Sequence, residues 1–389
     1  MPMRLRTVAL AVAGLLAAAA VILAPAPAHA VTCTTTLWTA GTGGYASYRI
    51  PAVVAEGSVV LAFAEGRRDS AADNGSIAVV ERRSTDGGCT WTAQQRVAAD
   101  GGQTVGNPQP MVAADGTLVL LTTWQGGAYT QTQIVAGQVP APWGRRVYVQ
   151  TSADQGVTWT ARREITSSVK IADWLWYATG PGHGLTLTTG PHSGRLVAAA
   201  DHWNLDGVEH GVVLITSDDA GATWQMGADD TQSGALHPDE ASAAQLPDGQ
   251  IYISARDQGG TDPSSRDDTY SADSGETYTQ PFQAQPQIVT SEVEGSVLQD
   301  SGLPAGVSCH PLLYSGPEDP AARQHLTIRR SDDDGVTWRT VTTITAATVP
   351  AGYSDIAKTS RTTLGVLYET GTTGYAERID FKSVAVVCP

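Results

Sequence analysis

Short runs in which apolar and polar residues alternate recur along the chain, and each run leads into the same kind of polar segment. These runs cover residues 76–83, 146–150, 211–216 and 325–329. A period of two is typical of β-strands that bury one face. No segment shows a convincing helical period, and the Ala-rich stretch 197–200 is interpreted as a buried inner strand because it is short and lies between Gly and His. The pattern therefore predicts an all-β fold.

The polar segment is an internal repeat of the form Ser-x-Asp-x-Gly-x-Thr-Trp. Its copies begin, with Tyr278 in place of Trp in the fourth, at Ser84, Ser152, Ser217, Ser271 and Ser331. The starts are 68, 65, 54 and 60 residues apart, which suits one four-stranded β-propeller blade with a long loop per repeat. In each copy the Asp can accept backbone N–H bonds, the Gly takes a positive φ and the Trp packs on the blade, so the repeat is structural. We therefore expect a six-bladed β-propeller of four-stranded antiparallel blades.

The first 30 residues have the pattern of a secretory signal peptide. Arg4 and Arg6 precede an apolar stretch at 8–23, and residues 28–30 have the small-x-small form of a cleavage site. A membrane anchor is the alternative, but the stretch is Ala-rich and is followed by prolines and a cleavage site. We expect residues 31–389 to form one propeller domain that is secreted, extracellular, monomeric and free of membrane contact after cleavage.

The charge of this predicted mature chain excludes nucleic acid as a partner. Loss of Arg4 and Arg6 leaves 24 − 2 = 22 basic residues against 39 acidic ones, a net charge near −17. Such a surface repels a phosphate backbone.

Four cysteines, Cys33, Cys89, Cys309 and Cys388, would meet an oxidising compartment, where three pairings are possible. Their spacing fits no zinc site. A propeller commonly closes by letting its two chain ends share one blade, which would bring Cys33 near Cys388. We therefore predict a Cys33–Cys388 disulfide and, for the remaining pair, Cys89–Cys309. The alternative is that the terminal cysteines are free in frayed ends.

Further motifs accompany the repeat in a fixed order. They are YRIPA at 48–52, FAEGR at 63–67, DEASAAQLPDGQIYISAR at 239–256, ARQHLTIRRSDDDGVTW at 322–338 and YSDIAK at 353–358. In this order the chain resembles the bacterial exo-α-sialidases of the Asp-box sialidase family, glycoside hydrolase family 33, over nearly the whole mature length. The repeat alone also occurs in propellers without catalysis, so the combination carries the resemblance. Ser254 stands where Asn is commoner in the family.

The resemblance implies a retaining exo-α-sialidase that needs no cofactor and removes terminal sialic acid from glycoproteins, glycolipids and oligosaccharides. Sialic acid carries a carboxylate on its anomeric carbon, and the resemblance assigns this group to Arg49, Arg256 and Arg323. A guanidinium stays charged and matches a carboxylate bidentately, which a lysine cannot do. Arg67 is assigned to the ring substituents, and the adjacent Arg68 is expected to be exposed.

The resemblance also assigns the catalytic groups: Tyr353 as nucleophile, Glu240 as its base and Asp73 as the general acid and base. Sialidases are known as the glycosidases that use tyrosine where most use a carboxylate. A carboxylate nucleophile would be repelled by the substrate carboxylate, by about 4 kcal/mol at ~4 Å near a protein surface. A tyrosine with a pKa of ~10 is protonated and therefore needs a base. Asp69 competes with Asp73 for its role, and either could instead cap a turn.

His183 and His202 could suggest a metal, but they lack a ligand cluster, so no catalytic metal is predicted. Other functions stay open. A propeller that only binds sialic acid would lose Tyr353, Glu240 or Asp73, and none is lost here. A hydrolase of a related nonulosonic acid, such as the deaminated sugar, or a trans-sialidase would use the same arginines and tyrosine.

Overall fold

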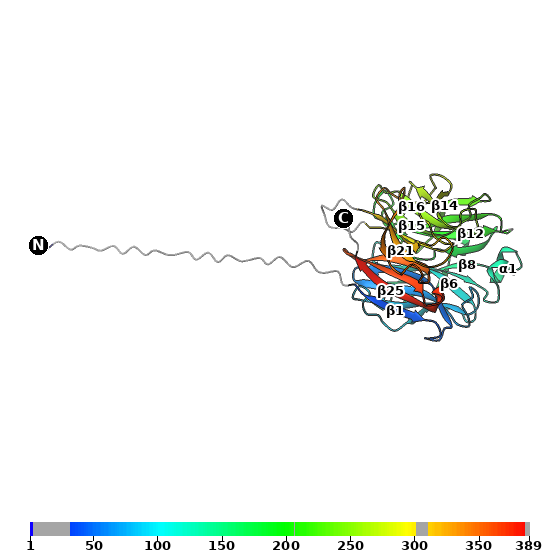
Figure 1. Ribbon diagram of the computed structural model, residues 1–389, viewed down its shortest axis with the longest axis horizontal. Helices are drawn as coiled ribbons and strands as arrows, with labels where there is room; N and C mark the ends of the chain where they lie inside the picture. Colours follow the sequence, from blue (N-terminus) through cyan, green and yellow to red (C-terminus); the bar gives the residue numbers. More distant parts are fainter. Residues whose placement is uncertain (3–31, 206, 301–309, 386–389) are drawn as a thin grey trace. The chain divides into compact units, whose positions relative to one another are not determined.

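The protein is built from consecutive antiparallel meanders that follow one another around the molecule (Figure 1). The computed structural model describes residues 1–2, 32–205, 207–300 and 310–385. The predicted signal peptide, residues 1–30, lies outside this range except for its first two residues, and so remains a prediction. All helices and strands described here lie between Thr34 and Ala385.

Four blades are separate sheets. One contains β10 (Trp174–Thr179), β12 (Leu196–Asn204), β13 (His210–Ser217) and β14 (Gln225–Gln232), with β11 (Leu185–Thr186) beside β12. The next contains β15 (Pro238–Gln245), β16 (Ile251–Asp257), β17 (Arg266–Ser271) and β18 (Gln283–Gln285). It is followed by β19 (Ser296–Gln299), β20 (Leu312–Pro317), β21 (Leu326–Ser331) and β22 (Arg339–Thr343). The last holds β23 (Ala351–Ser360), β24 (Thr363–Thr370), β25 (Arg378–Ala385) and β1 (Thr34–Thr39).

The remaining strands form one eight-stranded sheet rather than two separate blades. Its first meander is β2 (Ser47–Glu56), β3 (Val59–Arg67), β4 (Ile77–Ser84) and β5 (Gln95–Ala98), and its second is β6 (Thr104–Val112), β7 (Leu118–Gln125), β8 (Arg146–Ser152) and β9 (Arg163–Glu164). The two meanders are joined by one parallel pair, Ile77 with Thr104. The all-β propeller is thus confirmed, although the predicted six blades appear, within the described residues, as four separate sheets and one joined sheet.

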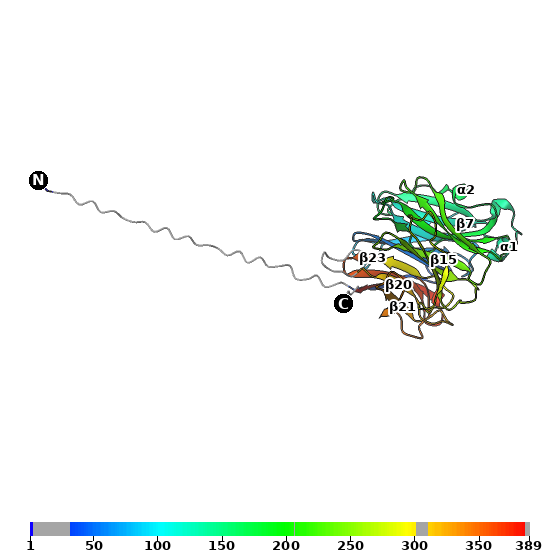
Figure 2. The same ribbon diagram turned by 90° about the horizontal axis from the view of Figure 1, so that it is seen from above.

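Helical structure is confined to short segments. These are α1 (Gln131–Val135), α2 (Thr166–Val169) and two single 3₁₀ turns, Ala141–Trp143 and Tyr375–Glu377. Both α-helices lie at the periphery (Figure 2). No helix in the described part of the chain is long and apolar enough to cross a membrane.

The repeat forms the turn that its composition predicts. In the last copy Asp333 Oδ1 accepts from the backbone N–H of Thr337 at 2.8 Å, and Gly335 has a φ of 100°. The indole of Trp338 donates back to the Gly335 carbonyl at 2.8 Å. Each predicted strand leading into a repeat is observed, as β4, β8, β13 and β21.

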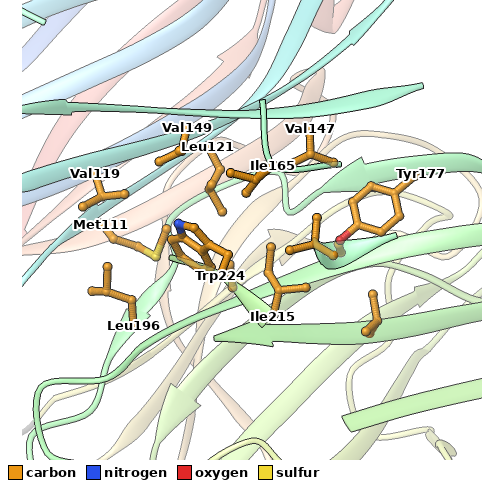
Figure 3. Packing of buried hydrophobic residues seen from close by; sticks show 14 of the residues in the cluster. Met111, Val119, Leu121, Val147, Val149, Ile165, Tyr177, Leu196, Ile215 and Trp224 are labelled. Atoms are coloured by element: carbon orange, nitrogen blue, oxygen red, sulfur yellow. The ribbon is translucent and has the colours of Figure 1, made fainter. Parts of the chain in front are cut away.

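The tryptophan of a repeat also packs against neighbouring strands. Trp224 is 5% exposed and lies in a cluster with Met111, Val119 and Leu121 from the preceding blade (Figure 3). The Ala-rich stretch 197–200 is a buried part of β12, as predicted. The repeat turn therefore places an aromatic side chain in the apolar core between two adjacent blades, and this packing stabilises their order around the ring.

The chain ends share a sheet, as predicted, because β1 pairs with β25 as its outermost strand (Figure 1). The predicted Cys33–Cys388 disulfide is wrong. Cys33 is bonded to Cys89, with Cα atoms 5.2 Å apart. The register explains this result, since the Cys33 carbonyl accepts from Ser383, several residues before Cys388.

Cys89 is brought to Cys33 by the first repeat turn, which packs on the last sheet. The rings of Trp91 and Phe381 lie 5.0 Å apart there. The disulfide therefore joins the first blade to the outer strand of the last one. The predicted Cys89–Cys309 pair is excluded as well, because Cys89 is already bonded. Cys309 and Cys388 themselves lie outside the described residues.

Candidate active site

All seven predicted site residues line one pocket of about 320 Å³. They come from four sheets or the loops beside them: Arg49 on β2, Arg67 at the end of β3, Asp73 in the loop after it, Glu240 on β15, Arg256 on β16, Arg323 before β21 and Tyr353 on β23. A propeller brings such distant segments together because its strands converge toward the central axis. The sequence motifs therefore meet at one place.

Tyr353, Glu240 and Arg256 form a directly bonded group. The Tyr353 hydroxyl donates to Glu240, with its Oη 2.6 Å from Oε2 and 2.8 Å from Oε1. Arg256 Nη1 lies 3.0 Å from the same Oη and 2.9 Å from Glu240 Oε2. A phenol in contact with a carboxylate and a guanidinium can lose its proton to the first and have the resulting negative charge stabilised by the second.

Burial sets the protonation behaviour of this group. Burial raises the pKa of Glu240; Arg256 opposes this shift and Asp239 adds to it. Burial raises the pKa of Tyr353 well above 10, while Arg256, Arg323 and Arg49 act to lower it. The raised pKa of Tyr353 makes the phenol a weaker acid, while the raised pKa of Glu240 makes the carboxylate a stronger base. The two shifts therefore partly cancel in the free energy of proton transfer from Tyr353 to Glu240.

Arg49 and Arg323 complete a ring of guanidinium groups around Tyr353. Their central carbons lie 5.3 Å and 5.5 Å from the centre of its ring, and similarly close to the ring of Tyr375. Arg323 donates to the Glu292 carbonyl at 2.9 Å. Three cations on one side of the pocket make it a site for an anion.

Glu369 holds two of these residues in place and was not found from the sequence. Its Oε1 accepts from Arg49 Nε at 2.6 Å and from the Ile50 N–H at 2.9 Å, and its Oε2 accepts from the Tyr353 N–H at 3.1 Å. Ile50 has a φ of 60°, which is uncommon for a β-branched residue. The buried carboxylate stabilises this conformation and couples the strand of Arg49 to the strand of Tyr353.

Asp73 lies on the pocket rim beside Arg67. Arg67 Nη1 is 2.6 Å from Asp73 Oδ1, and the Asp73 side chain is 82% exposed, while that of Arg67 is 3% exposed. Glu65 Oε2 accepts from the other side of the Arg67 guanidinium at 2.8 Å. Asp69, the competing candidate, lines a different hollow together with the exposed Arg68. Of the two aspartates, only Asp73 faces the pocket that contains Tyr353.

The chain is similar to known proteins over most of its length. Residues 57–366 match the model of the BNR repeat-like domain family. Sialidase-3 of Mus musculus is 30% identical over 394 residues, which is 86% of this chain and 90% of that protein. The chain belongs to the sialidase family. A sialidase of Micromonospora viridifaciens is 31% identical over 344 residues, covering 85% of this chain and 51% of the relative, so the chain spans about half the length of that protein.

A solved structure shows the same fold for this sialidase-family chain. The Hadza microbial sialidase Hz136 superposes with a TM-score of 0.78 at 25% identity, covering 91% of this chain and 68% of that one. The propeller fold is therefore shared with a solved sialidase.

Several further residues that sequence reasoning missed line the pocket of this sialidase-family chain. Arg145 stacks on Trp176 with 3.9 Å between the guanidinium carbon and the ring centre. Trp176 donates to Asp201 at 2.9 Å, and burial raises the pKa of Asp201 well above its usual range. Asp239 accepts from Arg256 at 3.0 Å and from Trp203 at 2.8 Å. Asp239 directly precedes Glu240 in the motif at 239–256, and this position was the one sequence feature that could have indicated a place in the pocket.

The two histidines considered as metal ligands have other partners. His183 Nδ1 lies 2.6 Å from Asp355 Oδ1, and His202 Nε2 lies 2.8 Å from Asp229 while its ring stacks on Trp174. Among the described residues of this sialidase-family chain, no group of three or more His, Cys, Asp or Glu is arranged to hold a metal ion.

Proposed function

We propose that the chain is a retaining exo-α-sialidase that hydrolyses terminal sialic acid from glycoconjugates. The observation that carries the proposal is the Tyr353–Glu240–Arg256 group inside a ring of arginines. A neutral nucleophile next to several cations suits a substrate whose reacting carbon carries a carboxylate. Sialidase relatives that cover most of the chain support the same assignment.

In this proposal the substrate carboxylate binds Arg49, Arg256 and Arg323. The anomeric carbon then lies over Tyr353, because all three guanidinium groups surround that ring or contact its hydroxyl. Arg67 contacts the ring substituents. Its pairing with Glu65 fixes the guanidinium, so little side-chain freedom is lost on binding.

The first half of the reaction forms a bond between Tyr353 Oη and the anomeric carbon. Glu240 takes the phenolic proton as the oxygen attacks, and the glycosidic C–O bond breaks. Asp73, in its protonated form, donates its proton to the leaving oxygen. The aglycone departs with that proton, and the sugar remains covalently bound to Tyr353.

The second half releases the sugar. Asp73, now ionised, takes a proton from a water that attacks the anomeric carbon from the side that the aglycone has left. The bond to Tyr353 Oη breaks and the phenolate regains its proton from Glu240. Both catalytic pairs return to their starting states, and two displacements retain the configuration.

The decisive experiment uses the purified protein with an aryl N-acetylneuraminide, its deaminated analogue and a fluorinated sialosyl substrate. We expect release of the aryl group and a trapped sugar on the peptide that contains Tyr353. Proton NMR of early product distinguishes retention from inversion, and adding lactose detects transfer. Release from the deaminated analogue alone would favour the alternative substrate, while binding without release would favour a non-catalytic lectin.

We also propose that residues 1–30 direct secretion and are then removed, and that the mature protein is an extracellular monomer. The basic and apolar pattern of this segment supports the first part. Amino-terminal sequencing of the protein recovered from culture medium would have to begin at Val31. Light scattering of the same sample tests the monomer.

A further inference from the structure

Three arginines stand apart from the others in their contacts. Within the described residues, Arg68, Arg96 and Arg361 make no side-chain hydrogen bond, ion pair or ring contact. Every other arginine there donates to a carboxylate, carbonyl or side-chain oxygen. Two of the three, Arg68 and Arg96, line the same surface hollow.

This hollow is about 600 Å³ in volume. Its lining is Arg68, Asp69, Ser76, Arg96, Ala99, Gly101 and Gly102. Asp69 is the one acidic residue in the lining, so the two cations exceed the negative charge locally. The whole chain has a net charge of −15, and a cationic hollow on such a protein stands out as a local site for an anion.

The loop that carries the proposed general acid lines both the hollow, through Arg68, Asp69 and Ser76, and the pocket, through Arg67 and Asp73. This loop runs from Arg67, at the end of β3, to Ile77, where β4 begins. Arg67 Nη1 binds the Ala71 carbonyl at 2.6 Å and Asp73 on the pocket side, and Ser76 Oγ donates to the Gly101 carbonyl at 3.2 Å on the other side. The loop is therefore held by hydrogen bonds near both of its ends, and it contributes residues to the pocket and to the hollow.

The position of Asp73 gives the direction in which the leaving group departs. A general acid must lie within hydrogen-bond reach of the oxygen that it protonates. The sugar that carries this oxygen must then lie beside the exposed Asp73 side chain at the rim. Arg68 lies on the same loop as Asp73, so further groups on that sugar can reach toward the hollow that Arg68 and Arg96 line.

We propose that the Arg68–Arg96 hollow is a leaving-group subsite for an anion carried by the sugar to which sialic acid is linked. This proposal rests on the proposed sialidase function. The recognised chemistry is a carboxylate or a sulfate, since both match a guanidinium bidentately. The first would come from a second, α2,8-linked sialic acid and the second from a sulfated galactose.

The experiment compares kcat/KM for three substrates: α2,3-sialyllactose, an α2,8-linked disialoside and an α2,3-sialyl-6-sulfogalactoside. The variants are Arg68→Ala and Arg96→Ala, with Arg361→Ala as the matched control. Arg361 is equally exposed and unpaired, but it lies in the turn after β23. Thermal unfolding of all three variants checks that the fold is unchanged.

We expect the ratio of kcat/KM for an anionic substrate to that for sialyllactose to fall about two- to fivefold in each hollow variant, the size of an exposed ion pair. The ratio should stay at the wild-type value in Arg361→Ala. It should also fall in the wild type at about 1 M salt, where the Debye length is about 3 Å. If the ratio falls in the hollow variants for the disialoside alone, the hollow is a carboxylate subsite. If it falls for the sulfated substrate alone, the hollow is a sulfate subsite.

Two further outcomes overturn the proposal in different ways. If Arg68→Ala and Arg96→Ala lower kcat/KM equally for neutral and anionic substrates, or leave the ratio of kcat/KM at the wild-type value, the subsite is rejected. The proposed function stands in that case, provided that the wild type hydrolyses sialyllactose. Absence of release from every substrate by the wild type rejects the function and the subsite together.

Discussion

Tyr353 Oη lies within 2.8 Å of both carboxylate oxygens of Glu240. Either oxygen can therefore receive the phenolic proton without movement of the Glu240 side chain. In the proposed mechanism this contact allows a tyrosine with a raised pKa to act as the nucleophile, since the proposed base Glu240 and the cation Arg256 already lie beside its hydroxyl. The first prediction tests this pair.

Tyr353→Phe should lower kcat for an aryl sialoside on the order of 10³-fold or more, because the attacking oxygen is lost. Binding of an unreactive sialoside, measured by calorimetry, should persist, since the three arginines remain. Tyr148→Phe, on β8 and outside the pocket lining, is the control for loss of a tyrosine hydroxyl. Trapping of the fluorinated sugar on another residue would contradict the assignment.

Arg256→Lys should not behave as a conservative change. The guanidinium bonds Tyr353, Glu240 and Asp239 at once, and an ammonium cannot reproduce that planar fork. We expect a loss on the order of 2–4 kcal/mol in transition-state binding, which is roughly 30- to 1000-fold in kcat/KM. A change of less than about threefold would count against its place in the carboxylate site. Arg146→Lys, in an exposed pair with Glu164, is the control.

Asp73→Ala should affect substrates according to their leaving groups. Lactose is a poor leaving group and needs the acid, whereas a nitrophenol departs without a proton. We expect the loss with sialyllactose to exceed the loss with a nitrophenyl sialoside by about 10²-fold or more. Asp69→Ala should give equal effects on both, because its side chain lines the separate hollow. If Asp69→Ala shows the leaving-group effect instead, the acid has been assigned to the wrong aspartate.

The fold could be predicted from the sequence because its repeat is local. Five copies of one turn sequence fix a hydrogen-bonded motif that needs only its own residues, as Asp333 and Thr337 show. Each strand before a copy alternates in a way that one buried face requires. The joining of the first two meanders was not predictable, since it depends on one backbone pair, Ile77 with Thr104.

The residues that line the pocket could be predicted from the sequence where they fall in motifs, and not where packing alone brings them there. Tyr353 and Arg256 lie in segments whose order along the chain is informative. Glu369 and Arg145 are ordinary charged residues in sequence, and only the fold places one under Arg49 and the other against Trp176. Their roles follow from contacts between blades that are distant in the chain.

The Cys33–Cys89 bond leads to a prediction about stability. It closes a loop of 56 residues between the ends of the ring. In the chain-entropy description such a crosslink stabilises by about 4 kcal/mol, although part of the effect is also described as enthalpic. Cys89→Ser should therefore lower the melting temperature, and reductant should lower that of the wild type but not of the variant. Peptide mapping without reductant must recover Cys33 linked to Cys89.

The last prediction concerns Glu81, a buried carboxyl outside the pocket. It accepts from the Trp159 indole at 2.8 Å and from Gln95 at 3.2 Å, beneath the second repeat turn. Burial raises the pKa of Glu81 to about 7, while the bond from Trp159 acts to lower it. The folded state therefore binds a proton more tightly than the unfolded state, in which the pKa of a glutamate is about 4.3.

This difference in pKa determines how the free energy of unfolding changes with pH. Below about pH 4 the carboxyl is protonated in both states, and its full contribution to stability is present. As the pH rises through about 7 that contribution is lost, on the order of 3 kcal/mol in all. Glu81→Gln keeps the shape and an acceptor for Trp159 but cannot ionise. The variant should thus match the wild type near pH 4 and exceed its free energy of unfolding near pH 8.

Urea unfolding of the two proteins across this pH range measures the effect, with Glu164→Gln as the control at an exposed site. The difference between the two curves isolates Glu81 from the other buried carboxyls, because those titrate in both proteins. Two parallel curves would show that Glu81 has the same pKa in the folded and unfolded states. The hydrogen bonds from Trp159 and Gln95 would then offset the cost of burying its charge.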